Sequence, residues 1–219
     1  MAAVFREARE ASSRSRRLQL TKTHCFTRLL RRKLSISRMT PSAPTPQRVY
    51  LLPHDPQWAE EFARESAALA SALNPLLVEF HHIGSTAIPG IRAKPIIDML
   101  AVVDDLGALD RQNSRMEALG YEAMGELGIS GRRYFRKNDA AGERTHQIHA
   151  FQTGSPQIER HLAFRDFMRT HREHALEYEA LKDRLAELYP TDISSYADGK
   201  DAFIHEMDVR AAAWRRDQS

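Results

Sequence analysis

A glycine, two hydroxyl residues and a carboxylate lie close together in the stretch Ile83–Val103, where together they could hold a phosphate or a metal. Gly84, Ser85 and Thr86 follow an apolar run, at the point where that run turns into a loop. Glycine allows close approach to the backbone, and hydroxyl and free N–H groups bind phosphate oxygens. A lone Gly-Ser pair is also typical of an ordinary strand-to-loop turn. We therefore expect these three residues to bind phosphate only in combination with other groups.

Asp98 is the carboxylate in the sequence IIDMLAVV, an apolar run that predicts a central strand covered on both faces. Burying a carboxylate without a partner costs several kcal/mol. We therefore expect a metal, a cation or several hydrogen-bond donors beside it. The alternative is a structural ion pair with Arg or Lys. The position of Asp98 on the strand after the Gly-Ser turn favours a functional role.

Basic residues near this stretch could complete a phosphate site. Lys94 and Arg92 lie in the loop that precedes Asp98. The functional interpretation of Lys94 is a cation over a phosphate, whereas Arg92 is better interpreted as a solvated loop charge. Arg133 and Arg136, on a later strand, are further candidates for the same cleft. Taken alone, each is typical of a surface charge or an ion-pair partner.

Two histidines on the last predicted strand are candidates for a base or a metal ligand. His146 and His149 point to opposite faces if the strand is regular, so both cannot point into one site. His149 shares its face with Gln147. The alternative for each is a hydrogen-bonded structural histidine, and the same ambiguity applies to His81 and His82.

Several common classes of protein are disfavoured by what the sequence lacks. There is no Gly-rich Walker-type loop, no Cys/His spacing for zinc and no nucleophile elbow. The one cysteine, Cys25, excludes an internal disulfide framework and fits a reducing compartment. No apolar run reaches the length of about 18 residues that a membrane helix needs. We expect a cytoplasmic protein with no membrane partner.

Hydrophobic patterning predicts the elements that position these residues. Residues 49–52 could be a short strand or an extended lead-in. The elements expected after them are a helix over about 56–73, strands over 76–83 and 95–103, a helix over about 105–119, strands over 121–124, 132–137 and 145–152, and three C-terminal helices, the last running from 193 or 196 to 214.

The N-terminal segment differs from the rest of the chain. Residues 1–40 contain eleven Lys and Arg residues against two Glu, although the net charge of the whole chain is only +3. A transit peptide, a basic arm for nucleic acid or membrane, and an extension from a start codon placed before Met39 are the alternatives. We expect residues 1–46 to be a disordered or basic extension and residues 47–219 to be the folded domain. We expect no nucleic-acid partner, because that role would rest on this segment alone.

Several segments together resemble the GrpB family of bacterial proteins. The most specific is HHIGSTAIPGIRAKPIIDML, and the resemblance extends over about residues 48–215. The matching segments are 55–62, 81–100, 131–138, 146–151 and 161–204, and they include the spaced elements FRD, Y-x-x-L-K and D-x-x-x-Y-x-x-x-K.

The resemblance implies a place in the nucleotidyltransferase superfamily of DNA polymerase beta-like folds. In that superfamily a Gly-Ser turn is followed on the next strand by two carboxylates, which hold two divalent metals around a nucleotide triphosphate. Gly84-Ser85 matches the turn and Asp98 matches the first acid, but Leu100 occupies the position of the second. A third acid would come from a later strand, where this chain has His149, which is better suited to a base or a softer metal than to Mg²⁺.

The fold expected from these observations is α/β, of α+β type. It has a mixed, largely antiparallel sheet of about five strands with a nucleotidyltransferase-like core, followed by C-terminal helices. The partner expected is a nucleotide or another phosphorylated small molecule, with Mg²⁺ or Mn²⁺ as the metal. The expected roles are catalysis for Asp98 and His149, metal binding for Asp98, and phosphate binding for Gly84, Ser85, Thr86, Lys94, Arg133 and Arg136.

Two functions follow as alternatives. The first is a nucleotidyltransferase-type enzyme or a nucleotide- or phosphate-binding derivative of one. A GrpB-like module fused behind dephospho-CoA kinase in some bacteria suggests a link to nucleotide or coenzyme A chemistry. The second is a catalytically inactive binding module, or a structural module that interacts with a partner, in which Asp98 pairs with Arg or Lys.

Overall fold

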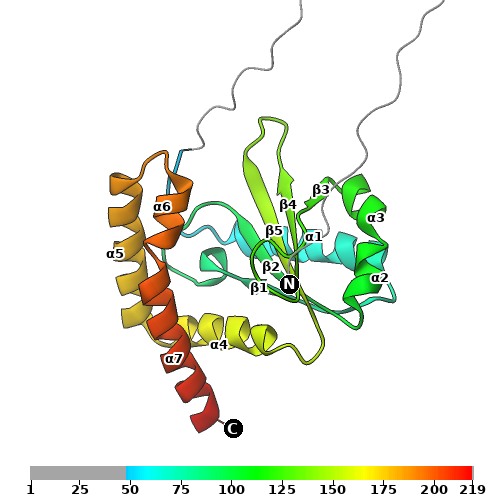
Figure 1. Cartoon of the computed structure of the whole chain (residues 1–219). Helices are drawn as coiled ribbons and strands as arrows, with labels where there is room; N and C mark the ends of the chain where they lie inside the picture. The colour runs from blue at the N-terminus through cyan, green and yellow to red at the C-terminus, as the bar shows by residue number, and fades with distance from the viewer. Residues whose placement is uncertain (1–47, 219) are drawn as a thin grey trace, which may run out of the picture. The chain divides into compact units, whose positions relative to one another are not determined.

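The structure is a computed structural model that describes residues 48–218. The expected extension over residues 1–46 lies outside the described residues. The elements, labelled in Figure 1, are α1 (Gln57–Leu73), β1 (Leu77–Ile83), η1 (Ser85–Ala87), β2 (Ile97–Val103), α2 (Leu106–Asp110), α3 (Asn113–Ala118), β3 (Tyr121–Ala123), β4 (Arg132–Asn138), β5 (Arg144–Gln152), α4 (Pro156–Thr170), α5 (Arg172–Leu188), α6 (Ile193–Asp198) and α7 (Asp201–Asp217).

The five strands form one sheet in the order β1-β2-β5-β4-β3. Strands β2 and β5 are parallel, and the other three pairs are antiparallel. The expected mixed, largely antiparallel sheet is therefore confirmed. The parallel pair lies at the centre, and its register places Asp98 beside Gln147 and Leu100 beside His149.

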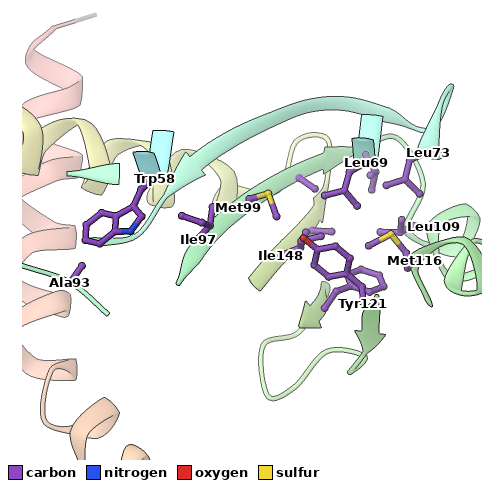
Figure 2. Packing of buried hydrophobic residues seen from close by; sticks show 14 residues of the cluster. Trp58, Leu69, Leu73, Ala93, Ile97, Met99, Leu109, Met116, Tyr121 and Ile148 are labelled. Atoms are coloured by element: carbon purple, nitrogen blue, oxygen red, sulfur yellow. The ribbon is translucent and has the colours of Figure 1, made fainter. Parts of the chain in front are cut away.

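One face of the sheet packs against α1, α2 and α3. Its core contains Met99 of β2, Ile148 of β5 and Tyr121 of β3, packed with Leu69 of α1 and Met116 of α3. Figure 2 shows Tyr121 lying close to Met116 and Ile148. Because side chains alternate along a strand, the residues between these core positions point to the opposite face. The neighbours of Met99, Asp98 and Leu100, therefore face away from this core.

The opposite face of the sheet is covered by α4. Leu100 and Phe151 pack there against Ile158 and Leu162 of α4. Figure 1 shows α5, α6 and α7 lying together beside α4, away from α2 and α3. Asp98 and His149 therefore lie between the sheet and the C-terminal helices.

Two predicted helices are each divided in the structure. The helix expected over 105–119 is split into α2 and α3, and this segment contains Gly107, Asp110 and Asn113, which are weak helix formers. The last helix is split into α6 and α7 at Gly199. A Cβ at Gly199 would lie 3.2 Å from the carbonyl oxygen of Ser195 and overlap a methyl group of Leu185, so α6 approaches α5 closely at this point.

The segment before α1 is extended and contacts both the C-terminal helical region and the loop before β2. Val49 is buried, and its N–H donates to the carbonyl of Pro190 at 2.8 Å. Leu52 forms an isolated antiparallel bridge with Ala93 in the loop before β2. Within residues 48–218, no helix combines the length and hydrophobicity needed to cross a membrane.

Candidate functional site

The turn after β1 is shaped around Asp98. Gly84 has φ 71° and ψ −169°, a conformation that is essentially restricted to glycine. A Cβ at this position would lie 2.9 Å from the Cβ of Asp98 and would overlap its Oδ2. Only glycine therefore lets the backbone pass directly beside the carboxylate.

The two hydroxyl residues after Gly84 make different contacts. The Thr86 hydroxyl is buried, donates to the carbonyl of Ile96 at 3.2 Å and lies 3.0 Å from Nε2 of His82. These bonds hold η1 against the segment that leads into β2. The side chain of Ser85 lies beside Tyr178 of α5, where it opposes the burial that raises the pKa of the phenol. Thr86 is thus occupied by internal hydrogen bonds, whereas Ser85 connects the turn to the helical layer.

Two adjoining cavities meet at this turn. Each has a volume of about 280–290 Å³, and both are lined by Gly84, Asp98, Gln147, Tyr178 and Lys200. We call the first the lysine lobe, because its other walls include Ser85, Thr86, Lys94, Lys182 and Tyr196. We call the second the histidine lobe, because its other walls include Ile83, His149, Arg160, His161, Phe164, Ile204 and Asp208.

The lysine lobe concentrates positive charge. The ammonium groups of Lys94 and Lys200 lie 5.5 and 4.7 Å from the ring centroid of Tyr196. No carboxylate of residues 48–218 lies within 4.0 Å of either group. Burial lowers the pKa of both lysines, and the negative charge of Asp98 opposes that shift. Lys182 differs, because its ammonium donates to the carbonyl of Arg92.

Asp98 forms the wall between the two lobes. Burial raises the pKa of its carboxyl group to about 6, although Lys200, Lys94 and Arg144 act in the opposite direction. Within residues 48–218 its carboxylate accepts no hydrogen bond, so it is free to contact a ligand, a metal or water.

The histidine lobe contains two uncharged imidazoles. Burial is the main cause that lowers the pKa of His149, to about 3, and it also lowers the pKa of His161. Nδ1 of His149 lies 3.3 Å from a guanidinium nitrogen of Arg132, which can only donate. His149 therefore carries its proton on Nε2. Nδ1 of His161 lies 2.6 Å from the carbonyl of Gln157 and must donate to it, which leaves Nε2 as an acceptor.

Most of the predicted site residues converge on the two lobes, but the two arginines of β4 do not line either of them. Arg136 shares the face of Asp98, but its guanidinium is paired with Glu122 at 2.5 Å. Arg133 points to the opposite face and binds Asp110 of α2 through two hydrogen bonds of 2.6 and 2.8 Å. We expected Arg133 to share one cleft with Asp98. This expectation does not hold, because side chains alternate along β4 and Arg133 lies on the opposite face of the sheet.

Arg92, interpreted from the sequence as a loop charge, is ion-paired with Asp183 at 3.0 Å.

Several residues that reasoning from the sequence did not assign also line the lobes. The C-terminal helical segment supplies polar ones among them, including Tyr178, Lys182, Lys200, His161 and Asp208. A signal for some of them was present, because Tyr178 and Lys182 are four residues apart and so share a helix face. Only the tertiary structure shows that this face points at Asp98.

The donor set of the site fits one divalent metal better than two. Leu100, two residues after Asp98, is fully buried with Ile83 and Phe151 in an apolar cluster. Residues 48–218 contain no group of three or more His, Cys, Asp or Glu side chains arranged to hold a metal. The Asp98 carboxylate and the Gln147 amide remain as oxygen donors. One Mg²⁺ can be held by such a pair together with phosphate oxygens and water.

Comparison with known proteins identifies relatives over most of the described chain. The family described as "GrpB protein" matches residues 48–210. The UPF0157 protein YqkA of Bacillus subtilis is 42% identical over 170 residues, which cover 78% of this chain and 49% of that protein. The crystal structure of the conserved protein GrpB from Enterococcus faecalis gives a TM-score of 0.70 at 41% identity, covering 74% of this chain and 96% of that chain. This chain thus spans about half the length of the Bacillus relative.

Two weaker likenesses complete the comparison. A dephospho-CoA kinase of Mycolicibacterium paratuberculosis is 26% identical over 189 residues, which cover 76% of this chain and 46% of that protein. The Cid1 poly(U) polymerase with Mg 3'-dATP bound gives a TM-score of 0.45 at 14% identity, covering 68% of this chain and 49% of that chain. The likeness to Cid1 is too weak to bear on the site.

Proposed function

We propose that this chain, which belongs to the GrpB family, binds a phosphorylated small molecule, a nucleotide by class, with its phosphate groups in the lysine lobe. Ser85 and the backbone at Gly84 contact the phosphate oxygens, and Lys94 and Lys200 neutralise their charge. Thr86 positions the turn through its internal hydrogen bonds. Arg133 and Arg136 have no part in this proposal, because both are paired with carboxylates outside the two lobes.

The observation that carries the proposal is the presence of two half-buried ammonium groups, those of Lys94 and Lys200, with no carboxylate of residues 48–218 within 4.0 Å. Removing a charge from water without a close partner is costly, and Asp98 alone compensates both lysines only in part. A phosphate group in the lobe would supply the missing negative charge. The likeness to a dephospho-CoA kinase supports a ligand from nucleotide or coenzyme A chemistry.

Asp98 and Gln147 are the residues that would hold a single Mg²⁺ or Mn²⁺ beside the phosphates. Such an ion, when bound, neutralises phosphate charge and polarises the phosphorus–oxygen bonds. Lys200 binds the phosphates from the helical side of the lobe, Lys94 binds them from the loop before β2, and Asp98 faces them from the sheet. In this arrangement His149 has a binding role, since its tautomer presents Nε2–H as a donor and not as a base.

The proposal is tested by calorimetric titration of the full chain with sodium tripolyphosphate and with nucleoside triphosphates, in the presence of Mg²⁺. We expect Lys200→Met to weaken tripolyphosphate binding by roughly tenfold or more, as expected for loss of a charge-assisted hydrogen bond. Lys137→Met is the matched control. Its ammonium also lies against a tyrosine ring, 5.3 Å from the centroid of Tyr121, but it is paired with Glu65 outside the lobes.

Two results would contradict the proposal. The first is that the wild-type chain binds no phosphate compound. The second is that Lys200→Met and Lys137→Met change the affinity for tripolyphosphate equally. Either outcome would favour the alternative of a structural module that interacts with a partner.

Nucleotidyl transfer is a second candidate function, favoured by the unoccupied hydrogen-bonding capacity of Asp98 at the junction of the lobes. Such a reaction would form a bond from an acceptor hydroxyl oxygen to the α-phosphorus and release pyrophosphate. Turnover is measured as pyrophosphate release from a panel of nucleotides with Mg²⁺ or Mn²⁺. Activity that is unchanged in Asp98→Ala would remove this candidate and leave phosphate binding as the function.

A further inference from the structure

The histidine lobe differs chemically from the lysine lobe although the two share a wall. Its apolar walls are Ile83, Phe164 and Ile204, and each of its two imidazoles has its Nδ1 engaged in a hydrogen bond, with Arg132 for His149 and with Gln157 for His161. Each cavity alone is slightly smaller than the typical range of about 300–1,000 Å³ for small-molecule sites, and the joined pair falls within it. A ligand with its phosphates in the lysine lobe therefore has room for an uncharged ring in the histidine lobe.

Two hydrogen-bond acceptors in the histidine lobe lack a protein donor. Nε2 of His161 must accept, because Nδ1 donates to Gln157. Asp208 accepts from Arg160 at 2.8 Å through Oδ2, while its Oδ1 is buried and has no partner within residues 48–218. The buried Oδ1 of Asp208 destabilises the empty site, because no hydrogen bond compensates for its removal from water. A ligand N–H group would relieve that penalty.

The same lobe offers one donor. Nε2–H of His149 has no acceptor within residues 48–218, since the only bond of that ring is the one from Arg132 to Nδ1. The lobe thus presents two acceptors and one donor. An amino group on an aromatic ring has two hydrogens for the two acceptors, and an adjacent ring nitrogen can accept from His149. A uracil ring has one N–H and would leave one acceptor unsatisfied.

We propose that the histidine lobe binds the heterocycle of the ligand and that His161 and Asp208 select a ring bearing an amino group. This inference rests on the proposed function, because it requires the phosphates of the same ligand to occupy the lysine lobe. CTP and UTP form the best test pair, because they carry the same phosphates and sugar and differ only in the amino or oxo group of the ring and in the protonation of the adjacent nitrogen.

The test is a calorimetric titration of the full chain with CTP, UTP and sodium tripolyphosphate, each with Mg²⁺. We expect CTP to bind about tenfold more tightly than UTP, and His161→Phe to remove that preference while leaving tripolyphosphate affinity unchanged. His171→Phe is the matched control, because Nδ1 of His171 also lies beside the carbonyl four residues earlier, at 3.0 Å, and the ring lies outside both lobes. His161→Gln restores an acceptor and is expected to recover part of the preference.

The outcomes separate this inference from the function on which it rests. Equal affinity for CTP and UTP, or equal weakening of CTP and tripolyphosphate by His161→Phe, would overturn the inference while Lys200-dependent binding of tripolyphosphate still supports the proposed function. Absence of any tripolyphosphate binding would overturn both.

Discussion

Asp98 is held in an environment that disfavours its charged form. Its carboxyl pKa is about 6 in the folded chain, against an ordinary value of 3.8, because burial outweighs the nearby lysines. A raised pKa means that the folded state binds a proton more tightly than the unfolded state does. The free energy of unfolding therefore falls as the pH rises from about 4 to about 6, by an amount on the order of 3 kcal/mol.

This linkage predicts that Asp98→Asn stabilises the ligand-free chain at neutral pH. The amide has nearly the shape of the carboxylate but carries no charge, so we expect a gain of roughly 1–3 kcal/mol at pH 7.5. The gain should largely disappear at pH 4, where the wild-type carboxyl group is protonated. Urea unfolding at both pH values measures the difference. A loss of stability at pH 7.5 would instead indicate that Asp98 serves as the anion of a structural ion pair.

The chemistry of single residues was partly predictable from the sequence. A carboxylate inside a nearly continuous apolar strand is unusual, and that contrast alone identified Asp98. Arg133 carried no comparable signal, because an arginine on a strand has the same local pattern whether it faces a cavity or an ion-pair partner such as Asp110. Its pairing depends on the position of α2, which the local sequence does not encode.

At the scale of elements, the junction between β1 and η1 sets the distance between the turn and β2. Replacing Gly84 by alanine would both strain the backbone, at φ 71°, and push against Asp98. We expect Gly84→Ala to destabilise the chain by roughly 2–4 kcal/mol and to weaken tripolyphosphate binding. Gly154→Ala is the control, because Gly154 also has a positive φ, 85°, but a Cβ there would have no atom within 4 Å.

Thermal unfolding and calorimetry of the two glycine variants provide the measurement. Gly154→Ala should lose about 1 kcal/mol from backbone strain alone and keep its affinity. If both variants lost the same stability and the same affinity, close packing of Gly84 on Asp98 would have no special role.

The boundaries of elements show where local reasoning fails. The first helix and the two long central strands follow the hydrophobic pattern closely, since their apolar faces are buried in a single core. The last predicted helix is divided at Gly199, where Leu185 of α5 approaches the backbone closely. The contact between Gly199 and Leu185 joins residues distant in the sequence and leaves no room for a larger side chain directly before Lys200.

At the scale of the whole domain, the candidate site is assembled from two layers. The sheet supplies Asp98, Gln147 and His149 through the parallel pair β2 and β5, and the C-terminal helices supply Lys200 and Tyr178. Neither layer alone encloses the lobes. Ligand binding should therefore stabilise the packing of the helical layer on the sheet, which links the function proposed here to the stability of the domain.

The last prediction concerns how much of the chain this assembly requires. The residues that line the lobes and the hydrophobic clusters lie within residues 49–214, and Val49 packs with Tyr196 and Leu185 behind the lysine lobe. We expect a chain that begins at Met39 to keep its melting temperature within about 2 °C and its tripolyphosphate affinity within about twofold. Removal of residues 1–38 takes away eleven of the 32 Lys and Arg residues together with two Glu, which changes the formal net charge from +3 to −6, yet the two lysines of the lobe remain.

A chain that begins at Leu51 is the matched comparison. It lacks Val49 and its hydrogen bond to Pro190, so we expect a loss of roughly 1–3 kcal/mol in stability and weaker tripolyphosphate binding, because Tyr196 and Lys200 lose their support. Thermal unfolding and calorimetry of both shortened chains measure these effects. A marked loss of affinity in the chain that begins at Met39 would assign the basic segment to the binding site, and equal behaviour of the two shortened chains would show that Val49 does not support the lobe.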